Sequence, residues 1–523
     1  MKKVRSEKTN QPTGVSNRTM GRREFVGGAA AILAGAATYR TGVARADSAA
    51  TSLKTLDGST IAVDNSAVTE LKKGLKGDFL VDGLPDYDAA RHIWNAAIDR
   101  RPAIIIRCAD ADDIVRSVRF ARRHNALVSV RAGGHNAVGF AINDGGLTID
   151  LTRLRDVQVD QSARTARVGG GATFADFDGA THKFGLASTG PIISMVGVGG
   201  YTLGGGMGWL HRKLALGCDN LISAKAVTAD GRIVEASKTS HSDLYWAIRG
   251  GGGNFGIISN FEFRLAPVSD VLAGLVFHPL EDLPKVAGFV RDFNDHAPDD
   301  VCVWLMMRKA PASPLLPTEM HGRLVATIAA CYASADEDGD KALAPLRQFG
   351  RPLIDLVKRR AYSDWQKALD PSWGNGFHNQ WIGHYLPELT DGAAQTMLEY
   401  VSKVTSPATD VKLINLGGAV ARVDEDATAF GYRKSKYALV IQTRWAKADE
   451  TAQHLAWSQE FFDAMKVHST GKVYVNFIAD EGAKRVMDAY NPEAFKRLQA
   501  IKAKYDPRNQ FRMNQNIPPS RRA

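Results

Sequence analysis

The chain has 523 residues and a formal net charge of +10, with 44% hydrophobic and 23% charged residues. These proportions are ordinary for a folded globular protein, and the length predicts more than one domain. Residues 1–46 contain nine lysines and arginines against two acidic residues, so this segment holds most of the net charge. The remainder carries a small and dispersed charge, which argues against nucleic acid as a partner. The four cysteines are widely spaced without a CxxC pair, so we expect no metal site.

Residues 1–46 have the pattern of a twin-arginine export signal. Arg22 and Arg23 precede an apolar run, residues 26–37, and a small-residue cleavage site follows at Ala44-Arg45-Ala46. The apolar run is far shorter than the roughly 20 residues that span a bilayer. We therefore expect export through the twin-arginine machinery, cleavage near Ala46, a periplasmic or secreted protein and no stable membrane anchor.

After the leader, residues 47–84 are predicted to be a polar and partly disordered segment, and residues 85–267 alternate between helix and strand patterns. Helices are predicted over residues 89–98, 112–124, 176–184 and 242–248, and strands over residues 103–107, 127–130, 146–150, 165–168 and 257–263. Residues 225–228 and 233–236 flank Asp230-Gly231, which is typical of a β-hairpin.

Residues 268–466 lack the glycine-rich texture and predict a second domain, an antiparallel sheet covered by helices. Residues 467–523 return to the earlier style, with a strand expected over 472–477, a helix over 492–505 and a final loop over 514–519. The fold class is therefore predicted to be α+β, with a first domain that the chain leaves and re-enters.

Three glycine-rich segments carry the strongest signals. Arg131-Ala132-Gly133-Gly134-His135 follows a predicted strand, so its glycines let the backbone turn and approach a ligand closely. Residues 197–208 form the second segment, and residues 250–256 form the third. The third satisfies the G-x-G-x-x-G pattern, but a helix precedes it and a strand follows, so we reject a Rossmann dinucleotide site.

Seven segments, taken together and in this order, carry a resemblance to one family. They are residues 131–135, 197–208, 212–220, 228–231, 243–256, 474–477 and 514–516. The chain resembles the berberine-bridge-enzyme-like FAD-linked oxidases, in the superfamily of vanillyl-alcohol oxidase and p-cresol methylhydroxylase, over roughly residues 85–519. The resemblance implies a two-part FAD-binding domain, residues 85–267 and 467–523 with a berberine-bridge-type tail, and a substrate domain over residues 268–466.

The resemblance also implies which residues hold FAD. The implied cofactor-binding residues are Arg131, Gly133, Gly134, His135, Asn136, Gly139, Val196, Gly197, Gly199, Gly200, Gly204, Gly205, Gly206, Gly208, Asp219, Asn220, Gly256, Ile257, Tyr474, Asn476 and Asn516. Main-chain N–H groups of the first two glycine segments would bind the pyrophosphate, unless those glycines serve tight packing only. His135 is expected to bond covalently to the flavin 8α-methyl group. Many relatives add a cysteine link, but Ile193 stands at that position, so a single link through His135 is predicted.

The catalytic base is less clear from the sequence, because Phe477 and Leu416 stand where plant relatives have active-site tyrosines. Phe477 and Leu416 have no acid–base group. The remaining candidates are Tyr201, His211, His384 and Tyr385, of which we single out Tyr201, His384 and Tyr385, although each has an alternative structural role. A cavity poor in bases suits a substrate that ionises easily, such as a phenol, or one that loses hydride with little proton assistance.

The implied reaction is hydride transfer from a C–H bond of an alcohol, sugar or phenolic small molecule to FAD, with O2 as the second substrate and H2O2 as its product. Val196 stands where the family controls oxygen access, which favours an oxidase. Two alternatives stay open: a dehydrogenase that uses another acceptor, and a flavin-binding protein with little turnover. The sequence does not identify the substrate.

Overall fold

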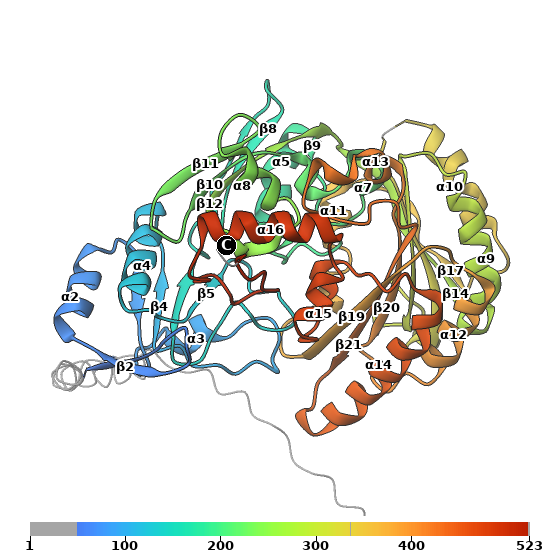
Figure 1. Cartoon of the computed structure of the whole chain (residues 1–523). Helices are drawn as coiled ribbons and strands as arrows, with labels where there is room; N and C mark the ends of the chain where they lie inside the picture. The colour runs from blue at the N-terminus through green and yellow to red at the C-terminus, as the bar shows by residue number, and fades with distance from the viewer. Residues whose placement is uncertain (1–49, 335, 521–523) are drawn as a thin grey trace, which may run out of the picture. The chain divides into compact units, whose positions relative to one another are not determined.

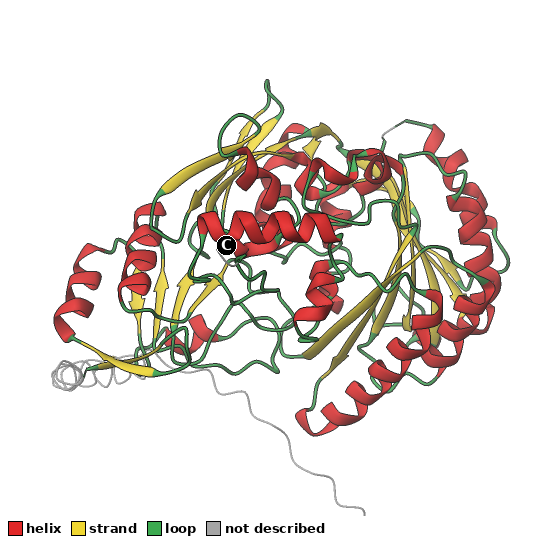
Figure 2. Cartoon of the chain, in the orientation of Figure 1, coloured by secondary structure: helices red, strands yellow, loops and turns green. Residues whose placement is uncertain are grey.

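The computed structural model describes residues 50–334 and 336–520, and the leader predicted over residues 1–46 lies outside the described residues. Residues Thr51–Ala523 are one of the two units into which the chain divides, and the elements below belong to it. Figure 1 gives their order along the chain and Figure 2 their helices and strands.

Of the polar segment predicted over residues 47–84, the described part, residues 50–84, forms regular elements and not the partly disordered stretch that we expected. It forms β1 (Thr51–Lys54), β2 (Thr60–Val63), α2 (Asn65–Gly74) and β3 (Asp78–Leu80). β1 and β2 pair as an antiparallel hairpin. Leu53 and Val63 are buried, so a few well-spaced apolar side chains suffice to attach this polar segment to the core.

A four-stranded sheet, ordered β3-β4-β6-β5, begins the first domain. It is formed by β4 (Ile104–Arg107), β5 (Val128–Arg131) and β6 (Leu147–Asp150), which run parallel, together with β3, which is antiparallel to β4. Helix α4 (Ala111–Arg123) begins at Asp110, whose side chain accepts a hydrogen bond from the Asp113 N–H. The helix predicted over residues 89–98 is only α3 (Tyr87–Arg91), and turns follow it.

A five-stranded antiparallel sheet, ordered β11-β10-β12-β8-β7, follows. Its strands are β7 (Val157–Asp160), β8 (Thr165–Gly169), β10 (Leu221–Val227), β11 (Ile233–Ser237) and β12 (Ile257–Arg264). The predicted hairpin is confirmed, because β10 and β11 pair antiparallel. The helices in this region are α5 (Phe174–Thr181), α6 (Val198–Gly204), α7 (His211–Leu214) and α8 (Ser242–Ala247). The short strands β9 (Leu186–Ala187) and β13 (Ala266–Pro267) pair separately.

The largest sheet has eight strands, all paired antiparallel, as predicted for the second domain. They are β14 (Asp270–Pro279), β15 (Val301–Lys309), β16 (Leu324–Tyr332), β17 (Ile354–Asp355), β18 (Lys358–Ala361), β19 (His378–Leu386), β20 (Asp410–Asn415) and β21 (Tyr437–Trp445). The helices are α9 (Leu283–Asn294), α10 (Asp338–Gln348), α11 (Tyr362–Lys367), α12 (Asp391–Ser402), α13 (Gly418–Arg422) and α14 (Thr451–Met465).

Neighbouring residues on each strand of this sheet point to opposite faces, so the two faces carry different sets of side chains. On β15, Leu305 packs in the cluster that also contains α9, α12 and α14, whereas its neighbours Trp304 and Met306 pack on the opposite side, toward the first domain. Figure 2 shows the helices along the outer face of this sheet. The inner face is therefore left for a site between the sheet and the first domain.

The C-terminal segment returns to the first domain through α15 (Ala483–Met487) and α16 (Pro492–Tyr505). Lys502 of α16 is fully buried and donates a hydrogen bond to the Asn254 carbonyl over 2.7 Å. The strand predicted over residues 472–477 was wrong: a short 3-10 turn, Val475–Phe477, stands there. The apolar pattern of this segment comes from burial of single side chains, because the segment pairs with no strand of the described chain.

Candidate functional site

A cavity lies where the first domain meets the inner face of the eight-stranded sheet. Its walls come from parts of the chain that are far apart in sequence: β5, the glycine-rich segments, the large sheet and the C-terminal loop. Of the predicted site residues, those lining it are Gly133, Gly134, His135, Asn136, Val196, Gly197, Gly199, Gly200, Tyr201, Gly256, Ile257, Tyr474 and Asn476. The structure therefore brings together most, but not all, of the residues that the sequence singled out.

Gly133 and Gly197 bring two main-chain segments into close contact in the wall of this cavity. A Cβ atom added to Gly133 would lie 2.5 Å from the Gly197 Cα, and one added to Gly197 would lie 2.5 Å from the Gly133 nitrogen. Both positions therefore require glycine for a steric reason. The two segments form a narrow backbone cradle, which suits a group held by main-chain N–H donors.

His135 lines the cavity directly after this cradle. Its ring stacks on Trp94, with ring centroids 4.0 Å apart and planes 18° from parallel. Its Nε2 atom is buried without a hydrogen-bond partner, and the apolar surroundings lower the pKa of the imidazole to about 3. The ring is thus neutral at ordinary pH and keeps a lone pair, as a nucleophilic nitrogen requires.

The glycines of the second segment, residues 197–208, fall into two groups. Gly197, Gly199 and Gly200 line the cavity at the start of α6, as predicted. The other four glycines of the segment lie outside the cavity lining, close packing or a positive φ accounts for each of them, and their role in cofactor binding stays a prediction. Two of them are sterically restricted: a Cβ atom would lie 2.3 Å from Asn476 Oδ1 at Gly204, and 1.6 Å from the Gly190 carbonyl oxygen at Gly208. The other two have positive φ angles, +132° at Gly205 and +97° at Gly206.

Tyr474 connects the second glycine segment to Asn476, near the C-terminal end of the chain. Its hydroxyl oxygen accepts hydrogen bonds from the Gly206 N–H and from Asn476 Nδ2, each over 2.8 Å. Burial raises the pKa of the Tyr474 hydroxyl well above its ordinary value, so the group stays neutral. Tyr474 thereby positions Asn476 at the cavity wall, and both residues are where the sequence predicted them.

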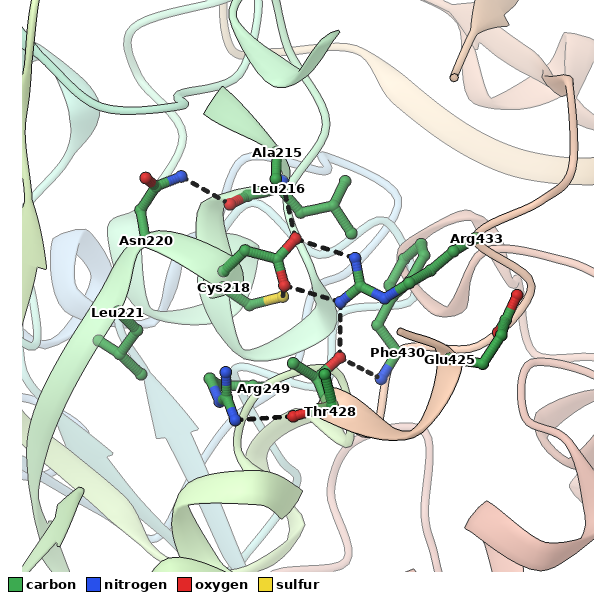
Figure 3. Close-up of polar contacts among 12 residues, drawn as sticks. Ala215, Leu216, Cys218, Asn220, Leu221, Arg249, Glu425, Thr428, Phe430 and Arg433 are labelled. Carbon is green, nitrogen blue, oxygen red and sulfur yellow. Dashed lines mark hydrogen bonds and ion pairs between the residues drawn. The ribbon is translucent and has the colours of Figure 1, made fainter. Parts of the chain in front are cut away.

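Asp219 and Asn220, predicted to hold the cofactor, instead fasten one part of the chain to another. Arg433 is fully buried and donates to both carboxylate oxygens of Asp219, over 2.7 and 2.9 Å. Figure 3 shows Arg433 also bonded to Thr428, at 2.7 Å. Asn220 donates to the carbonyls of residues 214 and 216. Neither residue lines the cavity: Asp219 holds the loop after α7 against residues 425–433, Asn220 bonds within the same stretch of chain, and their role in cofactor binding stays a prediction.

Three further predicted cofactor residues lie outside the cavity lining. Arg131 forms an ion pair with Asp150 at 3.9 Å and lines a neighbouring pocket instead. Gly139 has a φ of +78°, which glycine accommodates without strain, and serves the turn after Asn136. Asn516 follows two lining residues, Asn514 and Gln515, but does not line the cavity itself.

Of the catalytic candidates, only Tyr201 lines the cavity, where its buried hydroxyl has no hydrogen-bond partner. His384 lies against α14, stacked on Phe462 with ring centroids 4.1 Å apart, and Tyr385 is packed in the core. His211 is enclosed between two main-chain carbonyls. Strand alternation explains why His384 lies outside the cavity. Its neighbour Gly383 faces the inner side of β19, so His384 faces the outer side.

Several residues that line the cavity were not predicted. They are the tryptophans Trp304, Trp373 and Trp381, the polar pair Lys412 and Gln442, and residues Gly251, Gly252, Gly253 and Asn254. One feature of the sequence could have indicated Lys412 as a site residue. It is a lysine within an apolar run, Val411-Lys412-Leu413-Ile414, which is unusual for a buried strand. The third glycine segment does lack Rossmann context, with α8 before it and β12 after it, yet its backbone still forms part of the wall.

The described residues offer neither a metal centre nor a membrane-spanning helix. Over the residues that the structure describes, no group of three or more His, Cys, Asp or Glu side chains is arranged to hold a metal ion. No helix within those same residues is both long and apolar enough to cross a membrane.

Two protein families match the sequence directly: an FAD binding domain over residues 102–237, and the family described as berberine and berberine like over residues 473–518. The chain is 30% identical over 474 residues to (R)-6-hydroxynicotine oxidase of Paenarthrobacter nicotinovorans, covering 85% of this chain and 97% of that protein. It is 29% identical over 459 residues to an uncharacterized FAD-linked oxidoreductase of Bacillus subtilis, covering 86% and 99%.

Solved structures give the same result. The structure of 6-hydroxy-D-nicotine oxidase from Arthrobacter nicotinovorans aligns with a TM-score of 0.77 at 27% identity, covering 86% of this chain and 99% of that one. A chitooligosaccharide oxidase aligns with a TM-score of 0.75 at 23% identity, covering 87% and 99%, a likeness that concerns the fold. The predicted α+β fold, with its divided first domain and large antiparallel sheet, is thereby confirmed.

Proposed function

Because the chain belongs to the berberine-bridge-enzyme-like family of FAD-linked oxidoreductases, we propose that it is an oxidase of a small alcohol, sugar or phenolic compound that reduces O2 to H2O2. The observation that carries this proposal is the cavity in which the Gly133–Gly197 cradle and the unpartnered imidazole of His135 meet. When bound, FAD supplies the two-electron acceptor for the hydride and the site at which O2 is reduced.

The residues of the cavity fit this cofactor. Main-chain N–H groups at Gly133 and Gly197 would bind the pyrophosphate, since no side chain stands between the two segments. We propose that a ring nitrogen of His135 carries a covalent bond to the 8α-methyl group. Ile193 lines the cavity where many relatives place a second linking residue, and the four cysteines, all within the described residues, are absent from the lining. A single link follows from this arrangement.

The substrate end of the cavity is bounded by aromatic rings. Trp381 lies edge-on to Trp373 and to Phe477, with ring centroids 6.0 and 6.4 Å apart. With a flavin bound, these rings would limit the access of water to the reacting centre. Val196, also in the lining, stands where the family controls the access of O2, which supports an oxidase over a dehydrogenase.

The covalent link is tested by acid precipitation of the purified protein. The wild-type pellet should stay yellow and fluorescent, whereas His135→Ala should release its flavin into the supernatant. A Cys218→Ala variant serves as the control, because Cys218 is buried outside the cavity lining and its loss should leave the pellet yellow. Release of colour from the wild type would refute the link without any measurement of activity.

The reaction is tested by an anaerobic screen of alcohols, oligosaccharides and phenols, in which a substrate bleaches the visible absorbance of the bound flavin. Readmission of air should restore the absorbance and release H2O2 in equal amount to substrate oxidised. Bleaching without H2O2 would instead identify a dehydrogenase with another acceptor. Failure of every compound to bleach the flavin would favour a flavin-binding protein with little turnover.

We further propose that the protein is exported as a folded flavoprotein by the twin-arginine machinery. The support is the sequence of the leader, Arg22-Arg23 followed by a weakly apolar run. Replacing both arginines by lysine should keep the protein in the cytoplasm, still carrying its flavin, while the wild type moves to the periplasmic or secreted fraction. Equal export of both forms would refute the proposal.

A further inference from the structure

The inner face of the large sheet carries a buried group of charged side chains at the substrate end of the cavity. Lys412 and Asp410 stand two residues apart on β20, so both point to the same face, and their Nζ and Oδ2 atoms are 2.9 Å apart. Arg308 of β15 lies 3.2 Å from the same Asp410 oxygen. The side chains of Lys412 and Asp410 are only 2% and 1% exposed.

Positive charge exceeds negative charge in this group. Arg444 of β21 is also buried, and its guanidinium donates to Asn379 and to the main-chain carbonyls of residues 372 and 374. Among the described residues no carboxylate pairs with Arg444, so Asp410 is left to balance three cations. An excess of buried positive charge is costly, which points to an anion that completes the group.

Lys412 is the cation of this group that reaches the cavity lining. Its ammonium donates to Asp410 and to Gln442, which leaves its third N–H without a hydrogen-bond acceptor among the described residues. The ammonium lies 4.3 Å from the centroid of the Trp373 ring, and Trp381 belongs to the same wall. An aromatic wall beside one free N–H of an ammonium suits a planar ring with an anionic oxygen.

We infer that this cavity selects aromatic substrates that carry an anionic oxygen, a phenolate or a carboxylate, and that Lys412 is the residue that binds this oxygen. The inference rests on the proposed function, because it places the substrate in the same cavity as the flavin. It also accounts for Phe477: where the charged ammonium stabilises a phenolate, the substrate enters already ionised and needs no tyrosine base at that position.

The charge of Lys412 sets a pH limit on such binding. Burial lowers its pKa to about 8, while Asp410 favours the charged form and Arg308 and Arg444 oppose it. His135, in the same cavity, is neutral at ordinary pH and adds no charge. Affinity for an anion should therefore fall as pH rises through about 8, where Lys412 loses its proton.

Benzoate and its uncharged analogue benzamide test the inference on the flavin-loaded protein, by calorimetry and by the perturbation of the flavin spectrum. At about pH 7 benzoate should bind about tenfold or more tighter than benzamide, as a hydrogen bond between charged groups predicts. Lys412→Met should abolish this preference while benzamide binding stays. Lys225→Met, the same substitution at an exposed position of β10, should keep it.

Equal binding of benzoate and benzamide to the wild type would overturn the inference, and so would a preference that survives in Lys412→Met. The wild-type comparison stands even where the Lys412→Met chain fails to fold. A phenol whose own pKa lies below that of Lys412, such as 4-nitrophenol, separates the two anions when it is titrated across its pKa: tighter binding of the ionised form supports a phenolate site, and tight binding of benzoate alone supports a carboxylate site. Both readouts measure binding, so a protein that binds benzoate without oxidising any compound would refute the oxidase proposal and leave this inference standing.

Discussion

Breaking the buried ion pair between Asp219 and Arg433 should destabilise the fold without removing the cofactor. Asp219→Asn keeps the size of the side chain but leaves the Arg433 guanidinium, 0% exposed in the intact protein, without its negative partner. The intact pair makes two hydrogen bonds, over 2.7 and 2.9 Å. Loss of one partner of a buried, doubly bonded pair costs about 3–5 kcal/mol of unfolding free energy.

The assay is urea unfolding of the flavin-loaded protein, followed by tryptophan fluorescence, with the flavin content of the folded protein measured in parallel. Glu399→Gln is the control, because its pair with Lys403 is exposed on both sides, 57% and 65%, and its loss should change stability little. Arg433→Met should destabilise as Asp219→Asn does, and the double variant should lose less than the sum, because the two changes remove one interaction.

Two results would refute this reasoning. A loss of less than about 1 kcal/mol in Asp219→Asn would mean that the pair is dispensable, as surface pairs are. A loss of flavin at unchanged stability would mean that Asp219 holds the cofactor after all, as the sequence predicted. The expected outcome, lower stability with full flavin content, assigns Asp219 to the joint between the loop after α7 and residues 425–433.

Three further predictions concern packing, hydrogen bonding and pH. Gly133→Ala should abolish flavin retention, because its Cβ atom would lie 2.5 Å from the Gly197 Cα, whereas Gly179→Ala, with nothing within 4 Å, should be tolerated; absorbance near the visible maximum measures both. Tyr474→Phe leaves two N–H donors without their acceptor and should cost about 1–3 kcal/mol in urea unfolding, and an unchanged midpoint would contradict it. Burial lowers the pKa of His384 to about 4 from 6.5, so the unfolded chain takes up a proton at a higher pH than the folded chain does. The contribution of His384 to stability should be full above about pH 6.5 and be lost, by roughly 3 kcal/mol, toward about pH 4, and His384→Gln should make the measured fall shallower by that amount while His135 and His211 keep their own contributions.

Much of the fold was predictable because its signals are local. The spacing of apolar residues indicated α4, the Asp230-Gly231 turn indicated the β10–β11 hairpin, and continuous apolar runs indicated strands of the large sheet. The steric need for glycine at 133 and 197 is also a local property of the backbone, although their mutual contact is not. The wrong strand over residues 472–477 came from the same reasoning, since burial of single side chains in a loop imitates a strand pattern.

The composition of the site depended on contacts between distant segments. The order of the glycine motifs and His135 was sufficient to indicate a flavin cavity. The glycines act through the shape of the backbone, and His135 follows the first of these motifs directly in the sequence. Asp219 lies outside the cavity lining, paired with Arg433, which is more than two hundred residues away in sequence. Lys412 lines the cavity on the inner face of β20, where Asp410 of the same strand, Gln442 of β21 and the ring of Trp373 surround its ammonium group. Charge balance in a buried site is a property of the whole set of neighbours, and that set exists only once the sheet has formed.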